Sequence, residues 1–452
     1  MLITSDQLRA SFLAFLRERG HAILPSASLV AAGDSTALFT IAGMQPLMPY
    51  LLGEPHPLGR RLANAQKCLR TDDIEEVGDA SHGTSFEMLG FWSLGDYWKQ
   101  DSLRWTLEWF TEALGLEKER IAVTVFAGDD DAPRDDEAIA VWRALGIPDK
   151  RIFPLGKEEN WWGPIAATGP CGPDSELFYD TGLPHTPAFG PDCRPGCDCG
   201  RWVEIGNNVF MGYRQGADGS ISQLAQRNVD VGLGLERLLA TLNGATVYET
   251  DLYAEALRRL GELVPGSGAL PPERDTRLRR IIVDHTRAAT FLLADGVAPG
   301  NVERSYVCRR LIRRAAVSAH ALGVRAPILA EIARAFIATY RGAYPELARE
   351  EERILSELTR EEERFQRTLA RGLREFERLE VEVRAKGATM LSGEDLFRLA
   401  DTFGFPPTLT AELARERGLE VDLDSYEAAL RRQRDRSRRD TVRRLHAELA
   451  SK

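Results

Sequence analysis

The sequence predicts an α+β protein in which a β-rich N-terminal part precedes an almost wholly helical part. Residues 1 to about 240 contain apolar runs typical of strands, such as Ile121–Phe126 (IAVTVF), interleaved with Gly, Pro and Trp. Residues 265–272 (PGSGALPP) have the composition of a loop. Beyond them, apolar residues recur at near-helical spacing in residues 349–384, amid dense Glu and Arg. We expect that apolar stripe to pack against the core and the charges to form a solvated face.

Length and composition favour a large globular protein. The 452 residues are 43% hydrophobic, which is enough to bury a core in two or more domains. There is no run of eighteen apolar residues and no basic-then-apolar N-terminal signal, so we expect a cytoplasmic protein without a membrane partner. The net charge of −10 argues against indiscriminate polyanion binding but leaves room for a local basic surface.

The first element with chemical content is a predicted hairpin. Residues 67–70 (KCLR) have the pattern of a strand, residues 71–78 form an acidic turn, and residues 86–90 (FEMLG) and 93–97 (SLGDY) have the pattern of a returning strand. Arg70 therefore falls at the end of the first strand. We expect it to face the same region as the second strand.

Three cysteines are clustered in a loop further along the chain. Cys193, Cys197 and Cys199 have C-x₃-C-x-C spacing within residues 190–200 (GPDCRPGCDCG). Such clustering in a cytoplasmic protein favours a metal over disulfides, and zinc requires four ligands. We expect His185 to complete a zinc site, with a loop that binds no metal as the alternative. Cys68, Cys171 and Cys308 are isolated and are expected to be reduced, buried thiols.

The segment at residues 228–239 (NVDVGLGLERLL) is the most informative stretch of the chain. Its glycines, Gly232 and Gly234, lack the G-x-G-x-x-G spacing of a dinucleotide-binding turn. They lead instead to Glu236 and Arg237, a spacing in which small residues admit a nucleotide while a guanidinium reaches its phosphates or stacks on its base. This pattern favours an ATP-binding β-sheet.

A basic cluster opens the helical part. It comprises Arg304, Arg309, Arg310, Arg313 and Arg314, all on one predicted helix. We expect these arginines to contact the phosphates of a nucleic acid. The alternative is a salt-bridged helix face that packs on nearby glutamates.

The two blocks at residues 67–97 and 228–239 resemble motifs 2 and 3 of class II aminoacyl-tRNA synthetases. More narrowly, six separated segments in one order resemble the alanyl-tRNA synthetases, and the resemblance runs from about Thr4 to about Gln433. These segments are residues 39–44 (FTIAGM), 86–90 (FEMLG), 168–173 (TGPCGP), 178–180 (FYD), 209–211 (VFM) and 294–297 (ADGV). The resemblance implies an antiparallel β-sheet catalytic domain flanked by helices at residues 1–243, and a helical domain that recognises the tRNA acceptor stem at residues 244–452.

The resemblance also implies an ATP site. Activation of a carboxylate by ATP requires positive charge spread over the triphosphate, and Arg70 and Arg237 are the expected sources. Arg70 would contact the α-phosphate and the amino-acid carboxylate, and Arg237 would lie against the nucleotide beside Gly234. Phe86, Met88 and Trp92 are expected to form the adenine platform, with a plain core role as the alternative. Mg²⁺ is the expected cofactor beside ATP, with Glu204 as a candidate ligand or, alternatively, a solvent-facing carboxylate.

The implied amino-acid pocket for L-alanine comprises five residues, and Asp230 is expected to hold the substrate ammonium. These residues are Trp162, Asn207, Val209, Asp230 and Gly232. Trp162 and Val209 would exclude side chains larger than methyl, but size exclusion rejects glycine and serine only weakly. None of the seven histidines has the H-x-x-x-H or C-x-x-x-H spacing of the family's editing site. We therefore expect any proofreading to come from a separate editing factor.

For the tRNA partner, Asn301 and Asp401 match the family's pair that recognises the G·U wobble pair of the alanine-tRNA acceptor stem. A G·U pair presents donors and acceptors differently from Watson–Crick pairs, so short polar side chains can distinguish it.

The chain departs from the family at four positions near the expected active site, namely Gly83, Ser85, Phe91 and Gly206. The leading interpretation is an alanine–tRNA ligase. One alternative is a related ligase that passes a small activated amino acid to a nucleoside metabolite or carrier protein, which Asn301 and Asp401 argue against. Another is a catalytically silent tRNA-binding module, which Arg70, Asp230 and Arg237 argue against.

Overall fold

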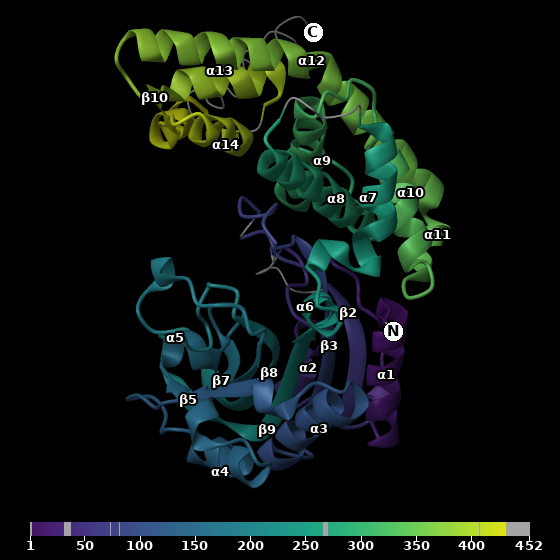
Figure 1. Cartoon of the computed structure of the whole chain (residues 1–452), viewed down its shortest axis with the longest axis vertical. Coiled ribbons are helices and arrows are strands. Elements are labelled where there is room, and N and C mark those ends of the chain that lie inside the picture. The colour runs from purple at the N-terminus through teal and green to yellow at the C-terminus, as the bar shows by residue number, and fades with distance from the viewer. Residues whose placement is uncertain are drawn as a thin grey trace, which may run out of the picture.

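The computed structural model describes residues 2–30, 38–72, 74–80, 82–264, 270–405 and 407–430. It confirms the α+β class. A mixed, mainly antiparallel sheet with flanking helices occupies the lower part of the molecule in Figure 1, and a group of helices occupies the upper part. The predicted loop at residues 265–272 falls mostly outside the described residues, and α8 begins at Pro272.

The main sheet has the strand order β1-β2-β3-β9-β8-β7-β4-β5, with β6 paired to β7. Its strands are β1 (Ala22–Ile23), β2 (Arg61–Leu69), β3 (Ser85–Leu94), β4 (Ile121–Phe126), β5 (Ile152–Leu155), β6 (Trp161–Trp162), β7 (Gly169–Asp180), β8 (Trp202–Gln215) and β9 (Ile221–Gly234). The β1–β2 and β4–β5 pairs are parallel and the others are antiparallel. A separate parallel pair joins β10 (Met390–Leu391) to β11 (Glu420–Val421).

Helices flank the sheet and build the rest of the chain. They are α1 (Ser5–Glu18), α2 (Met48–Leu51), α3 (Lys99–Glu108), α4 (Asp136–Ala144), α5 (Lys157–Asn160), α6 (Leu235–Asn243), α7 (Asp251–Leu263), α8 (Pro272–Ala294), α9 (Glu303–Ala321), α10 (Leu329–Tyr340), α11 (Pro345–Arg349), α12 (Glu351–Ala385), α13 (Gly393–Phe403) and α14 (Pro407–Glu416). The long helix α12 runs along the upper part, and α13 lies alongside it.

The hairpin predicted at residues 67–97 is confirmed. β2 and β3 pair in antiparallel register, with Gln66 opposite Met88, and β3 continues to β9, with Trp92 opposite Asp230. Arg70 follows the last residue of β2 directly. The glycine-rich segment also divides as expected, because β9 ends at Gly234 and α6 begins at the next residue.

The apolar stripe of α12 packs as predicted. Its core side is formed by Ile354, Leu358, Phe365, Leu369, Phe376 and Leu379, all buried, and the half-buried Leu373 packs against the same core. Most of these residues recur every three or four positions, so they share one face of the helix. Between Leu358 and Phe365 this face carries the buried Glu361 and Glu362, and the opposite face carries exposed charged side chains.

Buried ion pairs join the sheet to the upper helices. Arg287 of α8 contacts Glu236 of α6, and Lys67 of β2 lies 2.8 Å from Asp295. The hydrophobic core is also continuous between the two parts. Helix α6 ends at Asn243, where Gly244 adopts the left-handed conformation. The division into domains at residue 243 stays a prediction.

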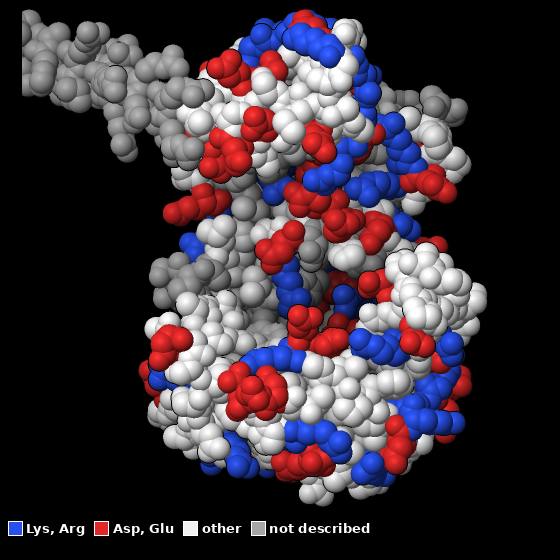
Figure 2. Space-filling model, turned by 90° about the vertical axis from the view of Figure 1, so that its left-hand side faces the viewer, with Lys and Arg blue, Asp and Glu red and all other residues white. Residues whose placement is uncertain are grey.

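The side of the molecule shown in Figure 2 is hollowed between the sheet part and the helical part. Both basic and acidic side chains lie around the hollow. Within the described ranges, no helix is both long and apolar enough to cross a membrane.

Candidate active site

A cavity of about 310 Å³ opens on one face of the sheet, where β2, β3, β7, β8 and β9 meet the start of α6. It brings together all but one of the residues predicted for the ATP and amino-acid sites. These are Arg70, Phe86, Met88, Trp162, Glu204, Asn207, Val209, Asp230, Gly232, Gly234 and Arg237.

Strand alternation explains why these residues converge. Side chains two positions apart on a strand point to the same face, as do Phe86 and Met88 on β3, and Asp230 and Gly232 on β9. Across the β8–β9 pair, Val209 lies opposite Asp230. Residues from short motifs that are separate in the sequence therefore line one cavity.

The glycine at position 232 keeps the floor of the cavity open. A Cβ atom there would lie 3.0 Å from the sulfur of Met88, closer than an ordinary van der Waals contact. Met88 is itself held in place, since its sulfur accepts a hydrogen bond from the backbone N–H of Gly43. A side chain at position 232 would therefore displace Met88 or occupy the cavity.

Asp230 is a buried carboxyl at the base of the cavity. Its Oδ1 accepts a 2.7 Å hydrogen bond from the indole N–H of Trp92. Burial raises the pKa of Asp230 to about 7, and the bond from Trp92 opposes that rise. A carboxylate in this setting is well suited to hold a cation that enters the cavity.

Trp92 is the one predicted ATP-site residue that does not line the cavity. Its side chain is fully buried, and its ring lies against Gly90, where a Cβ would approach it to 2.5 Å. A ring covered on all sides has no face for adenine, so the predicted platform role does not fit Trp92. Its indole N–H orients Asp230 instead.

The two predicted cationic residues lie at the exposed part of the cavity. The Arg70 guanidinium lies over the Phe86 ring, 5.0 Å from its centroid, and its Nε donates to the carbonyl of Ile41. Arg237 pairs with Glu204 at 2.6 Å, and both side chains are partly exposed. Each arginine keeps further N–H donors that a phosphate can accept.

Two acidic residues were missed by the sequence analysis. Asp174 lies on β7 and accepts 2.8 Å and 3.0 Å hydrogen bonds from the side chains of Asn207 and Asn160. Glu176 lines the cavity from the same strand face. The signal was present in the sequence, because both follow the quoted segment 168–173 at two-residue spacing.

Three carboxyl groups, those of Asp174, Glu176 and Glu204, lie close enough to influence one another on this side of the cavity. Burial raises the pKa of Glu176 to about 9, with further contributions from Glu204 and Asp174. Burial likewise raises the pKa of Asp174 to about 7. A divalent cation relieves such repulsion, and carboxylate oxygens are the ligands that Mg²⁺ prefers. Glu176 and Glu204, which both line the cavity, fit that ion.

A buried network supports the cavity from the helical part. Glu236 accepts the backbone N–H of Glu87 at 3.0 Å, and Arg287 donates to both Glu236 and Ser85. Glu87 in turn pairs with Arg9 of α1 at 2.6 Å. The position of Arg237 on α6 therefore depends on a helix that is distant in the sequence.

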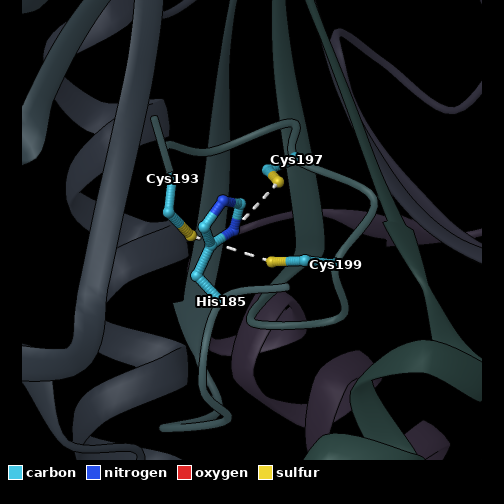
Figure 3. A group of neighbouring side chains, drawn as sticks. All are labelled: His185, Cys193, Cys197 and Cys199. Carbon is cyan, nitrogen blue, oxygen red and sulfur yellow. Dashed lines mark hydrogen bonds between the residues drawn. The ribbon is translucent and has the colours of Figure 1, made fainter. Parts of the chain in front are cut away.

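The four candidate zinc ligands converge, as Figure 3 shows. One ligand atom from each of His185, Cys193, Cys197 and Cys199 lies within 4.8 Å of all the others. The sulfurs of Cys193 and Cys199 are 3.7 Å apart. Two thiolates bound to tetrahedral zinc at about 2.3 Å would lie about 3.8 Å apart. The hydrogen bond from His185 lowers the pKa of Cys199 to about 6, which favours the thiolate that zinc requires.

The arginine cluster of α9 is placed differently from the prediction. Arg313 lies 2.7 Å from Glu361 of α12, and Arg314 lies 2.5 Å from Glu412 of α14. Arg314 and Arg313 are only 5% and 9% exposed, too little to reach an external phosphate.

The remaining members of that cluster are also engaged. Arg310 pairs with Glu75 and Glu412, Arg309 lies 3.2 Å from Glu361, and Arg304 donates to the carbonyl of Leu38. The predicted phosphate-binding role does not fit the buried Arg313 and Arg314, which the alternative, a salt-bridged face that packs on glutamates, describes. For the half-buried Arg309 and Arg310 the phosphate-binding role stays a prediction.

Asn301 and Asp401 lie at the ends of two different helices. Both are exposed, Asn301 just before α9 and Asp401 near the end of α13. Arg309 donates to the side-chain oxygen of Asn301, and Arg313 donates to the carbonyl of Gly404, which caps α13. Because both arginines contact Glu361, one carboxylate links the two helix ends.

The four departures from the family pattern have structural counterparts. A Cβ at Gly206 would lie 2.3 Å from Leu233 and 3.4 Å from Phe110, so these side chains fill the space beside β8. Gly83 and Ser85 line the cavity. Phe91 is buried in the core against Phe12.

Comparison with known proteins gives a consistent result. A sequence model of the family described as tRNA synthetases class II (A) matches residues 7–451. An alanine–tRNA ligase from Treponema pallidum is 46% identical over 432 residues, which cover 94% of this chain and 71% of that protein. One from Treponema denticola is 47% identical, covering 96% of this chain and 73% of that protein. One from Rubrobacter xylanophilus is 44% identical, covering 96% of this chain and 50% of that protein.

Proposed function

This chain belongs to the class II (A) family of tRNA synthetases, and we propose that it is an ATP-dependent alanine–tRNA ligase. It activates L-alanine to alanyl-adenylate and transfers the alanyl group to the 3′-terminal adenosine of tRNA(Ala). The observation that carries this proposal is that one cavity is lined by a buried carboxyl, Asp230, and by two arginines, Arg70 and Arg237.

We propose that alanine binds at the closed end of the cavity. The Asp230 carboxylate holds the substrate ammonium, and Trp92 orients that carboxylate and favours its ionised form. Val209 and Trp162 leave room for a methyl group but exclude longer side chains. Arg70 at the open end neutralises the alanine carboxylate as it attacks the α-phosphate.

ATP would lie across Phe86 and Met88, with Arg237 against the nucleotide. The half-buried Phe86 ring lines the cavity, and its contact with Arg70 shows that it can hold a flat group such as a nucleotide base. When bound, Mg²⁺ neutralises charge on the leaving pyrophosphate, and Glu176 and Glu204 are the residues that would hold it.

The helical part supports acceptor recognition. We propose that Asn301 and Asp401 recognise the G·U pair of the acceptor stem, because two exposed helix ends carry them and Glu361 links those ends. On this proposal residues 1–243 perform the chemistry and residues 244–452 recognise the tRNA.

The first step is tested by alanine-dependent exchange of labelled pyrophosphate into ATP. Arg70→Ala and Asp230→Ala should each reduce the exchange rate at least about a hundredfold, because each removes the charge that pairs with a substrate charge. Arg334→Ala, which alters an exposed arginine of α10, serves as the control and should leave the rate unchanged. Full exchange by the Asp230→Ala protein would remove the basis for the alanine pocket.

The second step is tested by alanylation of tRNA(Ala). Changing the acceptor-stem G·U pair to G·C should strongly reduce alanylation, and Asn301→Ala or Asp401→Ala should reduce transfer while pyrophosphate exchange persists. If adenylate forms normally but no tRNA is charged, tRNA is not the acceptor.

We also propose that His185, Cys193, Cys197 and Cys199 bind one zinc ion that fixes the loop between β7 and β8. Their ligand atoms already lie at distances close to those of a tetrahedral site. Protein purified under reducing conditions without chelator should contain one equivalent of zinc, and Cys197→Ser should lose it. Cys171→Ser, at a buried cysteine of β7 outside this group, should retain it. Metal analysis that finds no zinc in the unaltered protein would rule the site out.

A further inference from the structure

A row of arginines lies along the outer side of α12, away from the core. Arg360, Arg364, Arg367, Arg371 and Arg374 recur every three or four residues and are all exposed. Residues at that spacing share one helix face. We call these five residues the arginine face.

Four of the five residues of the arginine face form a local concentration of unpaired positive charge. Residues 364–374 (RFQRTLARGLR) contain four arginines and no Asp or Glu, in a protein of net charge −10. Arg360 pairs with Glu357. Among the described residues, no carboxylate forms an ion pair with the other four arginines.

Arginines elsewhere on α12 do form ion pairs with glutamates. Arg353 lies 3.0 Å from Glu350, Arg378 lies 2.8 Å from Glu375, and Arg384 lies 3.1 Å from Glu380. The helix therefore pairs its arginines with glutamates before and after the arginine face. A merely solvated face would be expected to continue the same alternation of charge.

A cavity of about 190 Å³ lies at the N-terminal end of the arginine face. Arg360, Arg364 and Arg367 line it from α12, and Arg309 lines it from α9. Glu357 and Glu361 also line it, so four guanidinium groups meet two carboxylates. The pocket thus carries an excess of positive charge and a set of planar donors suited to a phosphate.

This pocket adjoins the residue proposed to recognise the acceptor stem. Arg309, on its wall, donates to the side chain of Asn301. Burial is the chief cause that lowers the pKa of Arg313. The positive charges of Arg309 and Arg364 lower this pKa further, which shows that they act on a neighbouring residue. A polyanion bound at the pocket would therefore approach Asn301 directly.

We propose that the arginine face of α12 binds the sugar–phosphate backbone of the tRNA acceptor arm, with one phosphate in the pocket beside Asn301. This inference rests on the proposed function. Ten residues separate Arg364 from Arg374, which is about 15 Å along a helix, long enough for several successive phosphates of one strand. The basic surface is thereby assigned to α12, with Arg309 as the contribution of α9.

The test uses the full chain and an acceptor-stem RNA hairpin, with binding measured across a series of salt concentrations. The variant Arg364→Gln/Arg367→Gln should bind about tenfold more weakly near 0.1 M salt, and the slope of log K against log salt should fall by about 2. Glutamine keeps the helix propensity close to that of arginine, so the fold is retained. Arg258→Gln/Arg334→Gln removes the same two charges from exposed positions on α7 and α10 and should change neither quantity.

A second comparison separates phosphate binding from base recognition. The double variant should weaken binding of hairpins with G·U and with G·C by the same factor, because phosphate contacts position the RNA without specifying its sequence. Pyrophosphate exchange without RNA should be unchanged. Unaltered affinity and salt slope in the double variant would overturn this inference, whether or not the unaltered protein alanylates tRNA. Failure of the unaltered protein to alanylate any tRNA would instead overturn the proposed function.

Discussion

At the scale of single residues, Asp230 determines how the proposed alanine pocket responds to pH. Its pKa is raised to about 7 by burial, so an appreciable fraction of the empty pocket is uncharged at neutral pH. Only the ionised carboxylate can hold the substrate ammonium. The indole of Trp92 favours that ionised form through its hydrogen bond.

We therefore predict that KM for alanine in pyrophosphate exchange falls as the pH rises from 6 to 8, because Asp230 ionises through that range. Trp92→Phe removes the hydrogen bond that favours the carboxylate, so this midpoint should move to higher pH and KM for alanine at pH 7 should rise several-fold. The KM for ATP provides the internal control and should follow neither change. A pH-independent KM for alanine would contradict the assignment of Asp230.

At the scale of elements, α12 and the end of α13 approach each other at a glycine. A Cβ at Gly372 would lie 2.4 Å from the Phe405 ring, and Phe405 is fully buried. The ring also packs against Phe365, with centroids 5.7 Å apart, so it has little room to move. This contact holds the helix that carries Asp401 against α12.

Gly372→Ala should therefore destabilise the protein. Alanine is better than glycine inside a helix by roughly 1 kcal/mol, but overpacking a core costs about 1–3 kcal/mol, and a contact this short places the change at the upper end. Thermal unfolding should show a lower Tm. Gly261→Ala is the matched control, because Gly261 of α7 has open space around it and only the helix propensity should act there. A Tm that rises equally in both variants would show that α12 and residue 405 do not pack as described.

At the scale of the whole molecule, Arg287 joins the helical part to the sheet. It is 1% exposed, its Nε donates to the Ser85 hydroxyl at 3.1 Å, and it pairs with Glu236. Glu236 is buried beside Glu87, and burial raises its pKa. Arg287 supplies the positive charge that pairs with Glu236, while Arg9 pairs with Glu87.

Arg287→Ala should cost about 3–5 kcal/mol of unfolding free energy, since it leaves a buried charge unpaired. The pKa of Glu236 is higher in the folded protein than in the unfolded chain, so ionisation of this carboxyl at rising pH destabilises the folded protein. Without Arg287 this destabilisation should be larger, and the loss of unfolding free energy in the variant should therefore grow with pH. Urea unfolding at pH 6 and pH 8 measures both effects. Arg334→Ala, at an exposed ion pair, should cost less than about 1 kcal/mol at either pH. Equal stability of the Arg287→Ala and unaltered proteins would contradict a joining role.

The sequence by itself determined the local elements and most of the residues of the candidate site. The β2–β3 hairpin, the passage from β9 into α6 and the packed stripe of α12 each follow from residues close together in the chain, because side-chain period and turn composition are local properties. Phe86, Met88, Asp230 and Gly232 were implied by the resemblance to the family, and strand alternation explains why the two residues of each strand share a face.

Only the tertiary structure decided which charged groups are paired and which rings are covered. Arg313 and Arg314 look like a free basic surface in the sequence, but Glu361 and Glu412 approach them from helices 48 and 98 residues away. Arg364 and Arg367 lie in a stretch that is as rich in arginine as the one around Arg313, but they form no ion pair in the described structure. The Trp92 ring is likewise covered in part by a distant residue, Gly43, where a Cβ would lie 2.9 Å from the ring. Neither pairing nor burial is a property of spacing along the chain, because both depend on which distant elements fold against a residue.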